Sequence, residues 1–192
     1  MSNDPITRFK ELLSAAEHLG IEPHNAAALA TCGDDRQPTV RMVLLKEADE
    51  RGFVIYTNLE SRKAGQLADN PRASLCFWWA ALKRQVRVEG RVELVDKLEA
   101  DRYFASRPRG SQLGAWASHQ SSTITSREAL FARVAELTLK YNDQAVPRPP
   151  YWSGYRLVPE RIEFWKEQPD RLHEREVYTR HGSGWQTTLL AP

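Results

Sequence analysis

The chain has 192 residues, of which 41% are hydrophobic and 27% charged, and its formal net charge is +2. This composition is typical of a folded domain and excludes a disordered chain, while the near-neutral charge argues against a broadly basic nucleic-acid-binding surface. No apolar run approaches the ~20 residues of a membrane span, and the N-terminus lacks the apolar stretch of a signal peptide, so we expect a cytoplasmic protein.

The first predicted element is an amphipathic helix over residues 4–19. Asp4 suits its N-cap and Pro5 its first turn, and Gly20 follows its end. Apolar residues recur at helical spacing through this segment, namely Ile6, Phe9, Leu12, Leu13 and Ala16.

Short apolar or alternating runs follow, separated by turn-prone stretches, and predict antiparallel strands joined by hairpins. The five runs are 25–32, 39–47, 52–58, 73–82 and 84–95. Gly90 interrupts the alternation of the fifth run and indicates a bulge. Both cysteines, Cys32 and Cys76, lie in these apolar runs, so we expect buried, reduced thiols.

Helices and a last group of strands complete the prediction. Helices are expected shortly after residue 61, over 97–106 and over 126–142, whereas 107–125 is too broken for one element. The Pro-rich residues 147–150 form a rigid connector, and strands are expected over 152–167, 173–181 and 184–192. About eight strands without βαβ alternation favour a mainly β fold, an antiparallel barrel with outer helices. We expect one domain over 1–192, with an N-terminal helix in 1–20 and C-terminal strands in 147–192.

Common catalytic motifs are missing from the sequence. It contains neither GxGxxG nor GxxxxGK[ST], and its five histidines are scattered, so no metal site is predicted. If the chain is an enzyme, we expect its chemistry to come from a cofactor that the protein orients.

The strongest local sign of a ligand site is the segment 56–63, where a strand ends and a helix begins. Ser61 is expected to cap the helix, yet Arg62 and Lys63 place two cations in its first turn, where they oppose the helix dipole. A bound phosphate would resolve this conflict, because helix N-terminal amides and cations together bind anions. The alternative is a solvated first turn.

The strand 39–47 carries a basic residue at each end of an apolar stretch. Alternation places Arg41, Val43 and Leu45 on one face and Met42, Leu44 and Lys46 on the other. Such a strand suits an anionic ligand, or it is an edge strand with solvated ends.

Two further clusters are candidates for binding. Tyr103 and Arg107 share a helix face and Ser111 follows, which suits an oxyanion or, alternatively, a surface stack with a cap. In a strand, Arg171, His173 and Arg175 would share one face, and either a ligand or the carboxylates of Glu163 and Glu167 would balance that row. Four tryptophans are candidates for stacking on a flat ring or, alternatively, for the core or a dimer interface: Trp78, Trp79, Trp116 and Trp165.

The ordered set of these motifs resembles the pyridoxamine 5'-phosphate oxidase family. RMVLLK, YTNLESRKA, QVRVEG, YFASRPRGSQLGAWAS, QSS, EFW and RLHER occur in this order, and the resemblance covers residues 26–192. The resemblance implies an FMN-binding split β-barrel that acts as a homodimer with two flavin sites at the interface. The implied activity is the oxidation of pyridoxine or pyridoxamine 5'-phosphate by dioxygen to pyridoxal 5'-phosphate, with release of hydrogen peroxide.

The resemblance also implies roles for individual residues, several of them acting across the dimer. FMN contacts are assigned to Arg41, Met42, Val43, Leu44, Leu45, Lys46, Tyr56, Thr57, Arg62, Lys63, Gln85, Gln120, Ser121, Trp165 and Arg175. Substrate contacts are assigned to Lys46, Tyr103, Arg107, Ser111, Arg171, Leu172 and His173. Arg171 and His173 are the implied catalytic residues and would lie over the pyridine ring.

Two alternatives remain open. One is a related split-barrel flavin oxidase of the phenazine type, although Lys46 and Gln85 favour the vitamin B6 enzyme. The other is a non-catalytic protein that binds flavin or pyridoxal phosphate. The chain departs from the family at its end, which reads Leu-Leu-Ala-Pro where the family usually reads Arg-Leu-Ala-Pro, and in a shorter N-terminal arm.

Overall fold

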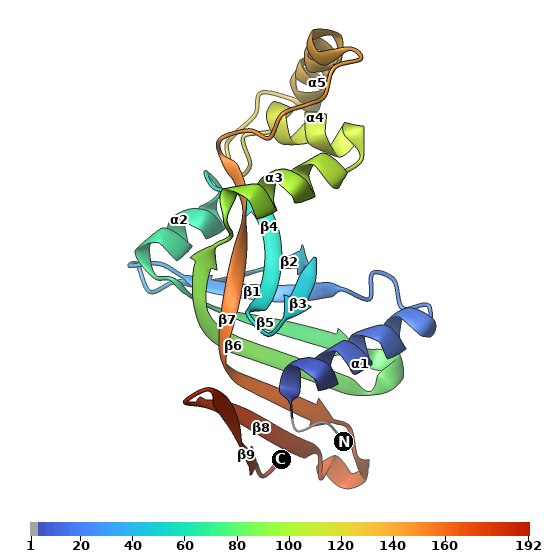
Figure 1. Ribbon diagram of the computed structural model, residues 1–192, viewed down its shortest axis with the longest axis vertical. Coiled ribbons are helices and arrows are strands. Elements are labelled where there is room, and N and C mark those ends of the chain that lie inside the picture. Colours follow the sequence, from blue (N-terminus) through green and yellow to red (C-terminus); the bar gives the residue numbers. More distant parts are fainter. Residues whose placement is uncertain (1–3) are drawn as a thin grey trace.

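The computed structural model describes residues 4–192, and these residues form one antiparallel sheet of nine strands with five α-helices (Figure 1). The strands are β1 (Ala26–Cys32), β2 (Pro38–Leu44), β3 (Glu47–Asp49), β4 (Gly52–Asn58), β5 (Arg72–Trp79), β6 (Arg84–Leu94), β7 (Trp152–Lys166), β8 (Glu174–His181) and β9 (Gly184–Leu189). The helices are α1 (Pro5–His18), α2 (Arg62–Asp69), α3 (Lys97–Ser106), α4 (Arg109–Ala117) and α5 (Arg127–Tyr141).

The sheet curls on itself and leaves a split between its two ends. Its strand order is β2-β1-β5-β6-β7-β4-β3, and β8 and β9 extend it from β7. Just beyond β2, the backbone N–H of Lys46 donates to the carbonyl of Val54 on β4 at 2.8 Å, which brings the two ends together. The predicted mainly β split barrel is therefore confirmed.

Helix α1 closes the inside of the curled sheet. The Asp4 carboxylate accepts from the Thr7 N–H at 2.8 Å, as expected of its N-cap. Phe9 is fully buried and makes edge contacts with Phe53 and Phe77, each with ring centroids 4.9 Å apart. The amphipathic pattern of this helix thus becomes core packing.

Gly90 marks a bulge between β6 and β7, as predicted. The register shifts between Glu89 and Gly90, and a Cβ at Gly90 would lie 2.0 Å from the carbonyl oxygen of Val158. Only glycine allows so close an approach of the two backbones.

Helices α3, α4 and α5 gather at one end of the molecule, and β7 runs from there to the C-terminal strands at the other end (Figure 1). Helix α4 was not predicted from the sequence, because Pro108, Gly110 and Gly114 break its helical pattern. It is held by the buried amide of Gln112, which donates to the carbonyls of Phe104 and Ala105 at 3.0 and 3.1 Å. This contact also satisfies the last carbonyls of α3.

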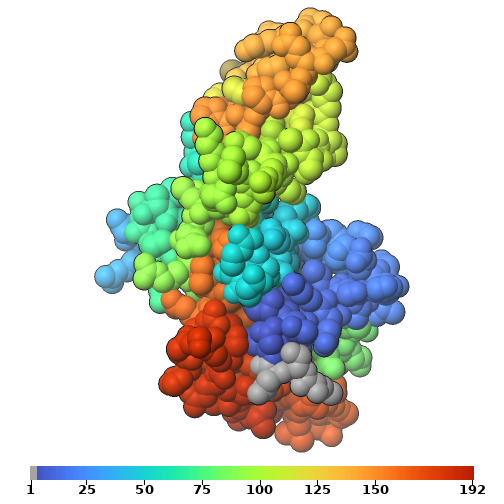
Figure 2. All heavy atoms as spheres, viewed as in Figure 1, coloured from blue at the N-terminus to red at the C-terminus, as the bar shows by residue number. Residues whose placement is uncertain are grey.

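The other end of the molecule brings α1 against the C-terminal strands, as Figure 2 shows in dark blue and red. Arg8 on α1 bonds to Glu176 on β8 and donates to the Tyr178 hydroxyl at 3.1 Å.

The two cysteines were expected to be buried, but Cys32 and Cys76 are only half-buried, and both are free thiols. Within residues 4–192, no helix combines the length and apolarity needed to cross a bilayer.

Candidate functional site

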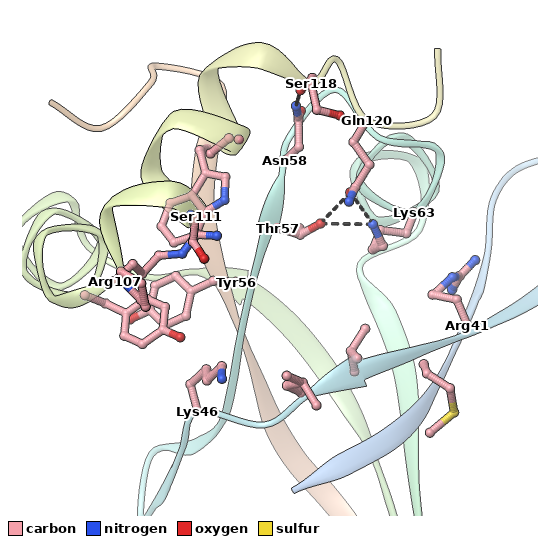
Figure 3. Close-up of a pocket in the computed structure, with 18 of the residues that line it drawn as sticks. Arg41, Lys46, Tyr56, Thr57, Asn58, Lys63, Arg107, Ser111, Ser118 and Gln120 are labelled. Carbon is pink, nitrogen blue, oxygen red and sulfur yellow. Dashed lines mark hydrogen bonds between the residues drawn. The ribbon is translucent and has the colours of Figure 1, made fainter. Parts of the chain in front are cut away.

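A cavity of about 800 Å³ opens between the split edges of the barrel and helices α3 and α4 (Figure 3). Its walls come from β2, β4, the first turn of α2, the end of α3 and the face of α4. Twelve of the predicted site residues line it: Arg41, Met42, Val43, Leu44, Lys46, Tyr56, Thr57, Lys63, Tyr103, Arg107, Ser111 and Gln120. The structure thus brings three of the four predicted clusters together, although they lie far apart in the sequence.

One end of this main cavity is built around Lys63. Its ammonium donates to Thr57 Oγ1 at 2.9 Å, to Ser61 Oγ at 3.2 Å and to Gln120 Oε1 at 2.7 Å. Burial, with a smaller effect from nearby Arg41, lowers the pKa of Lys63 to about 8. A desolvated ammonium without a carboxylate partner is a strong attractor for an anion.

Ser61 does not cap α2 as predicted, although it occupies the N-cap position. Its hydroxyl donates instead to the carbonyl of Asn58 at 2.7 Å. The Arg62 N–H at the start of α2 donates to Ser121 Oγ at 3.3 Å. The helix start is therefore joined to the segment after α4 rather than capped locally.

Arg41 lies between the barrel interior and the main cavity. Alternation on β2 follows the prediction, since Arg41 and Val43 are half-buried whereas Met42 is exposed. The guanidinium donates to the carbonyl of Leu29 at 3.0 Å and to Thr31 Oγ1 at 2.6 Å. Burial, helped by nearby Arg62, lowers the pKa of Arg41, which again indicates excess positive charge.

The opposite end of the main cavity carries Lys46, Arg107 and Ser111 (Figure 3). The Arg107 guanidinium lies 4.7 Å from the centre of the Trp152 ring. Its Nη1 atom is buried and has no hydrogen-bond partner among the described residues. Burial lowers the pKa of Arg107, although Tyr103 opposes that effect. A buried cationic nitrogen without an acceptor indicates a missing ligand.

Three aromatic rings form the wall beside Arg107. Tyr56 stacks on Tyr103 with ring centroids 3.9 Å apart and on Trp152 with centroids 5.3 Å apart. Burial is the main reason that the pKa of Tyr56 rises to about 12, so its hydroxyl stays protonated. Trp152 was not among the predicted candidates, because its place depends on the pairing of β7 with β4, where it faces Asn58.

A second group of predicted residues lies at the far end of β7. Trp165, His173 and Arg175 line another cavity of about 780 Å³, and the rings of Trp165 and His173 are 4.5 Å apart. Gln85 pairs with Trp165 across the β6–β7 ladder, and Trp165 pairs with Arg175 across β7–β8. Trp152 and Trp165 are thirteen residues apart on one strand, so up to about 40 Å of extended chain separates the two cavities.

The predicted strand 173–181 begins one residue late, and the predicted row of three basic side chains is not formed. Arg171 lies in a short 3-10 turn with a positive φ of 60°, and β8 begins at Glu174. Arg175 alone of this set pairs with a carboxylate, that of Glu163 at 2.9 Å, whereas Glu167 pairs with Lys83. Of the two carboxylates expected to balance the basic residues, Glu163 therefore does so for Arg175, whereas Glu167 does not pair with any of the three.

Six predicted residues line neither cavity: Leu45, Arg62, Gln85, Ser121, Arg171 and Leu172. Leu45 is buried, and Arg171 and Leu172 are exposed. Among the tryptophans considered for stacking, Trp79 belongs to the core, with its indole N–H donating to the carbonyl of His24 at 2.7 Å.

The main cavity can therefore hold ligands that place one anionic group at each of its two ends. Lys63 and its polar neighbours form one anion site, and Lys46, Arg107 and Ser111 form the other. Stacked aromatic rings lie beside the second site, which suits a planar ring attached to the anion. Among residues 4–192 no group of three His, Cys, Asp or Glu side chains could hold a metal ion.

Comparisons with known proteins agree with these features. A family model described as pyridoxamine 5'-phosphate oxidase matches residues 14–141, and one described as the pyridoxine 5'-phosphate oxidase C-terminal dimerisation region matches residues 152–192. A pyridoxine/pyridoxamine 5'-phosphate oxidase of Myxococcus xanthus is 57% identical over 190 residues, which cover 98% of this chain and 92% of that protein. The corresponding protein of Rhodospirillum rubrum is 54% identical, with 98% and 96% covered.

Solved structures show the same fold. PhzG from Burkholderia lata, in complex with tetrahydrophenazine-1-carboxylic acid, superimposes with a TM-score of 0.93 at 36% identity and covers 100% of this chain and 94% of that one. A pyridoxamine 5'-phosphate oxidase-related FMN-binding protein from Nostoc punctiforme matches with a TM-score of 0.78 at 17% identity, covering 100% of both chains. With its two family models, its relatives above 50% identity and its split barrel, the chain belongs to the pyridoxamine 5'-phosphate oxidase family.

Proposed function

We propose that this protein uses FMN to oxidise pyridoxine 5'-phosphate and pyridoxamine 5'-phosphate to pyridoxal 5'-phosphate. Dioxygen is the electron acceptor and hydrogen peroxide the by-product, and the amine substrate also consumes water and releases ammonia. The observation that carries the proposal is the pair of anion sites in the main cavity, because this reaction needs two phosphorylated molecules, FMN and the substrate, bound side by side. Relatives at 51–57% identity over nearly the whole chain bear the name of this activity.

The residues around Lys63 fit the phosphate of FMN. Lys63 is a desolvated cation, and burial together with nearby Arg62 lowers the pKa of Arg41. Thr57, Ser121 and Gln120 supply polar groups. Such charge-assisted bonds are the strong ones in phosphate recognition. The chemistry supplied by bound FMN is the two-electron oxidation of the substrate and the return of those electrons to dioxygen.

The residues at the opposite end fit the phosphate of the substrate. Lys46, Arg107 and Ser111 would hold it, and the unpartnered Nη1 of Arg107 would gain an acceptor. Tyr103, fixed by its stack on Tyr56, would donate its hydroxyl to the same phosphate. Held at this end, the pyridine ring would keep its reacting carbon against the flavin, so that positioning supplies much of the rate enhancement.

The site would be completed across a homodimer. Gln85, Trp165 and Arg175 belong to the assigned FMN contacts, yet they lie at the other end of β7 from the main cavity. One protomer alone cannot bring both groups to one flavin, and the C-terminal region matches a dimerisation module. We therefore assign these three residues, with Arg171, Leu172 and His173, to the main cavity of the partner protomer.

Arg171 and His173 would act on the substrate ring from that second protomer, Arg171 by polarising the ring and His173 by orienting it. The His173 ring is already held, because its Nδ1 accepts from the Gln168 N–H at 3.2 Å and its centroid lies 4.5 Å from that of the Trp165 ring. The exposed Arg171 is free to approach a ligand brought by the partner. We also propose a cytoplasmic location, in which the free thiols of Cys32 and Cys76 stay reduced.

The decisive experiment is a flavin spectrum followed by anaerobic addition of pyridoxine 5'-phosphate. We expect yellow protein whose flavin absorbance bleaches on substrate addition and returns when oxygen is admitted, with hydrogen peroxide formed. Protein that stays colourless after incubation with FMN would refute the proposal. Flavin that binds but is not reduced would instead point to a storage or sensing protein.

Arg171 provides a sharper test of the assigned roles. Arg171→Gln should lower turnover far more than it weakens FMN binding, because its assigned partner is the substrate. Arg180→Gln is the matched control, since Arg180 is exposed on β8, lies over the Trp185 ring and lines neither cavity. Equal losses of turnover and FMN affinity in Arg171→Gln would contradict its substrate role.

A phenazine-type oxidase is the second candidate, favoured by the close superposition on PhzG. Its 36% identity is well below that of the vitamin B6 oxidases. Parallel assays with pyridoxine 5'-phosphate and tetrahydrophenazine-1-carboxylic acid distinguish the two candidates, and we expect oxygen uptake with the first compound only.

A further inference from the structure

The most unusual polar group outside the main cavity is the carboxylate of Glu163 in β7. The residue is only 1% exposed, yet it carries a charge in the middle of the sheet. Three arginines from three strands surround it: Arg87 on β6, Arg161 on β7 and Arg175 on β8. A buried charge is stable only when it is paired and hydrogen-bonded, as this one is.

Strand register explains how the cluster forms. Arg87 and Glu163 are direct partners in the β6–β7 ladder, and Arg161 is two residues away on the same face of β7. Arg175 on β8 pairs with Trp165 on β7, and its side chain reaches back along β7 to the carboxylate. All four side chains therefore lie on the face of the sheet opposite the buried Val86 and Ile162.

The carboxylate remains ionised in this setting. Burial alone would raise the pKa of Glu163, but the hydrogen bonds from Arg87, Arg161 and Arg175 together outweigh it and hold the pKa below its ordinary value. The charge is thus available to orient the arginines at neutral pH.

Arg175 is the member whose geometry is most fully determined. Its Nε and Nη2 both lie 2.9 Å from Glu163 Oε1, and its Nη1 donates to the carbonyl of Ala191 at 3.0 Å. A guanidinium has five N–H donors, so one donor remains on each terminal nitrogen. The side chain is still 26% exposed, and it lines the cavity that contains Trp165 and His173.

We infer that Glu163 is a positioning residue for the flavin site: it fixes the Arg175 guanidinium so that its two remaining N–H groups face the FMN bound to the partner protomer. The inference rests on the proposed function, in which Arg175 contacts that FMN. Without the carboxylate, a long arginine side chain would have to lose its rotamer freedom on binding, and affinity would fall accordingly.

A double-mutant cycle separates this role from a purely structural one. The FMN dissociation constant is measured by flavin fluorescence quenching for the wild type, Glu163→Gln, Arg175→Ala and the double variant. We expect Glu163→Gln to raise the constant about tenfold, in the range of a lost charge-assisted contact. In the Arg175→Ala background the same change should add less than about twofold, because coupled residues are not additive.

Glu89→Gln is the matched control. Glu89 accepts a bond from Arg161 at 2.9 Å, so it belongs to the same charged face, but it does not contact Arg175. We expect its FMN affinity to equal that of the wild type. Thermal melting and sedimentation of every variant check that dimers of equal stability are compared. If Glu163→Gln does not form a dimer, Glu163→Asp replaces it, because that variant keeps the charge but withdraws the carboxylate from Arg175.

The outcomes distinguish the inference from the function on which it rests. Wild-type protein that binds no FMN refutes the proposed function. Wild-type protein that binds FMN, together with a Glu163 variant of unchanged affinity, overturns the inference alone. Losses that multiply in the double variant would also overturn it, since they would show that Glu163 acts independently of Arg175.

Discussion

Both ends of the main cavity carry positive charge, but the two cations differ in how fully they are hydrogen-bonded. At the end proposed for FMN, called the flavin end, the Lys63 ammonium has three hydrogen-bond acceptors of its own. At the end proposed for the substrate, called the substrate end, Arg107 lies over an aromatic ring and has a buried nitrogen with no acceptor within residues 4–192. The ammonium at one end is hydrogen-bonded to neutral groups but lacks an anion, whereas the guanidinium nitrogen at the other end still lacks an acceptor.

This difference matches the two ligands that the family reaction requires. A cofactor that stays bound through many turnovers favours a rigid polar site, whereas a substrate that must leave as product favours a site held by weaker contacts. Cation–π contact orients Arg107 at a modest free energy and leaves its hydrogen-bond donors for the phosphate.

The largest effect is expected at the flavin end. Lys63→Met removes a desolvated cation and should weaken FMN binding roughly 100-fold, as measured by fluorescence titration. The Michaelis constant for pyridoxine 5'-phosphate at saturating FMN should change little. Lys97→Met, an exposed lysine on α3, serves as the control. If Lys63→Met weakened FMN binding and raised the Michaelis constant by similar factors, the two ends would not be independent.

The converse variant, Arg107→Gln, should raise the Michaelis constant roughly 30-fold and leave FMN affinity near the wild-type value. The reason is that its guanidinium faces only the substrate end of the main cavity. Steady-state kinetics with excess FMN measure the change, and Arg91→Gln, an exposed arginine on β6, is the control. A wild-type Michaelis constant would remove Arg107 from the substrate site.

The pH dependence of FMN affinity should also identify the flavin end. Free Lys63 has a pKa of about 8, and a bound phosphate must raise that pKa because it stabilises the ammonium. Affinity should therefore be constant from pH 7 to near 8 and fall by up to about tenfold per unit above it. Isothermal titration between pH 7 and 10 tests this, and the fall should be absent in Lys63→Met.

The smallest effect is expected from the aromatic wall. Trp152→Phe keeps an aromatic ring, but the smaller ring makes less contact with Arg107 and Tyr56. The Michaelis constant should therefore rise about threefold. Turnover at saturating substrate should remain close to that of the wild type. If FMN affinity changed more than the Michaelis constant, the aromatic wall would belong to the flavin end of the main cavity and not to the substrate end.

Much of the fold and of the site could be predicted from local sequence. The cap at Asp4, the bulge at Gly90 and the alternation through Arg41 each depend on neighbouring residues, and all three are confirmed. The three clusters around Lys46, Lys63 and Arg107 were predicted separately as candidate anion sites. Their meeting in one cavity is a long-range property that spacing alone does not contain.

What could not be predicted depends on contacts distant in sequence. Helix α4 is stabilised by Gln112 binding the end of α3, which outweighs its two glycines and the preceding proline. Trp152 joins the site only because β7 pairs with β4. The row expected of Arg171, His173 and Arg175 failed because a turn at Asp170 and Arg171, both with positive φ, delays the start of β8.

The length of β7 restricts where insertions and deletions can occur as the protein evolves. The strand runs for 15 residues and holds Trp152 at one end and Glu163 and Trp165 near the other. A strand cannot stretch, and losing one residue from its middle would turn every later side chain to the opposite face. Deletions and insertions should therefore be tolerated in the exposed turn at 34–37 between β1 and β2. They should not be tolerated within β7, whose residue count sets the spacing between the main cavity and the cavity that contains Trp165 and His173.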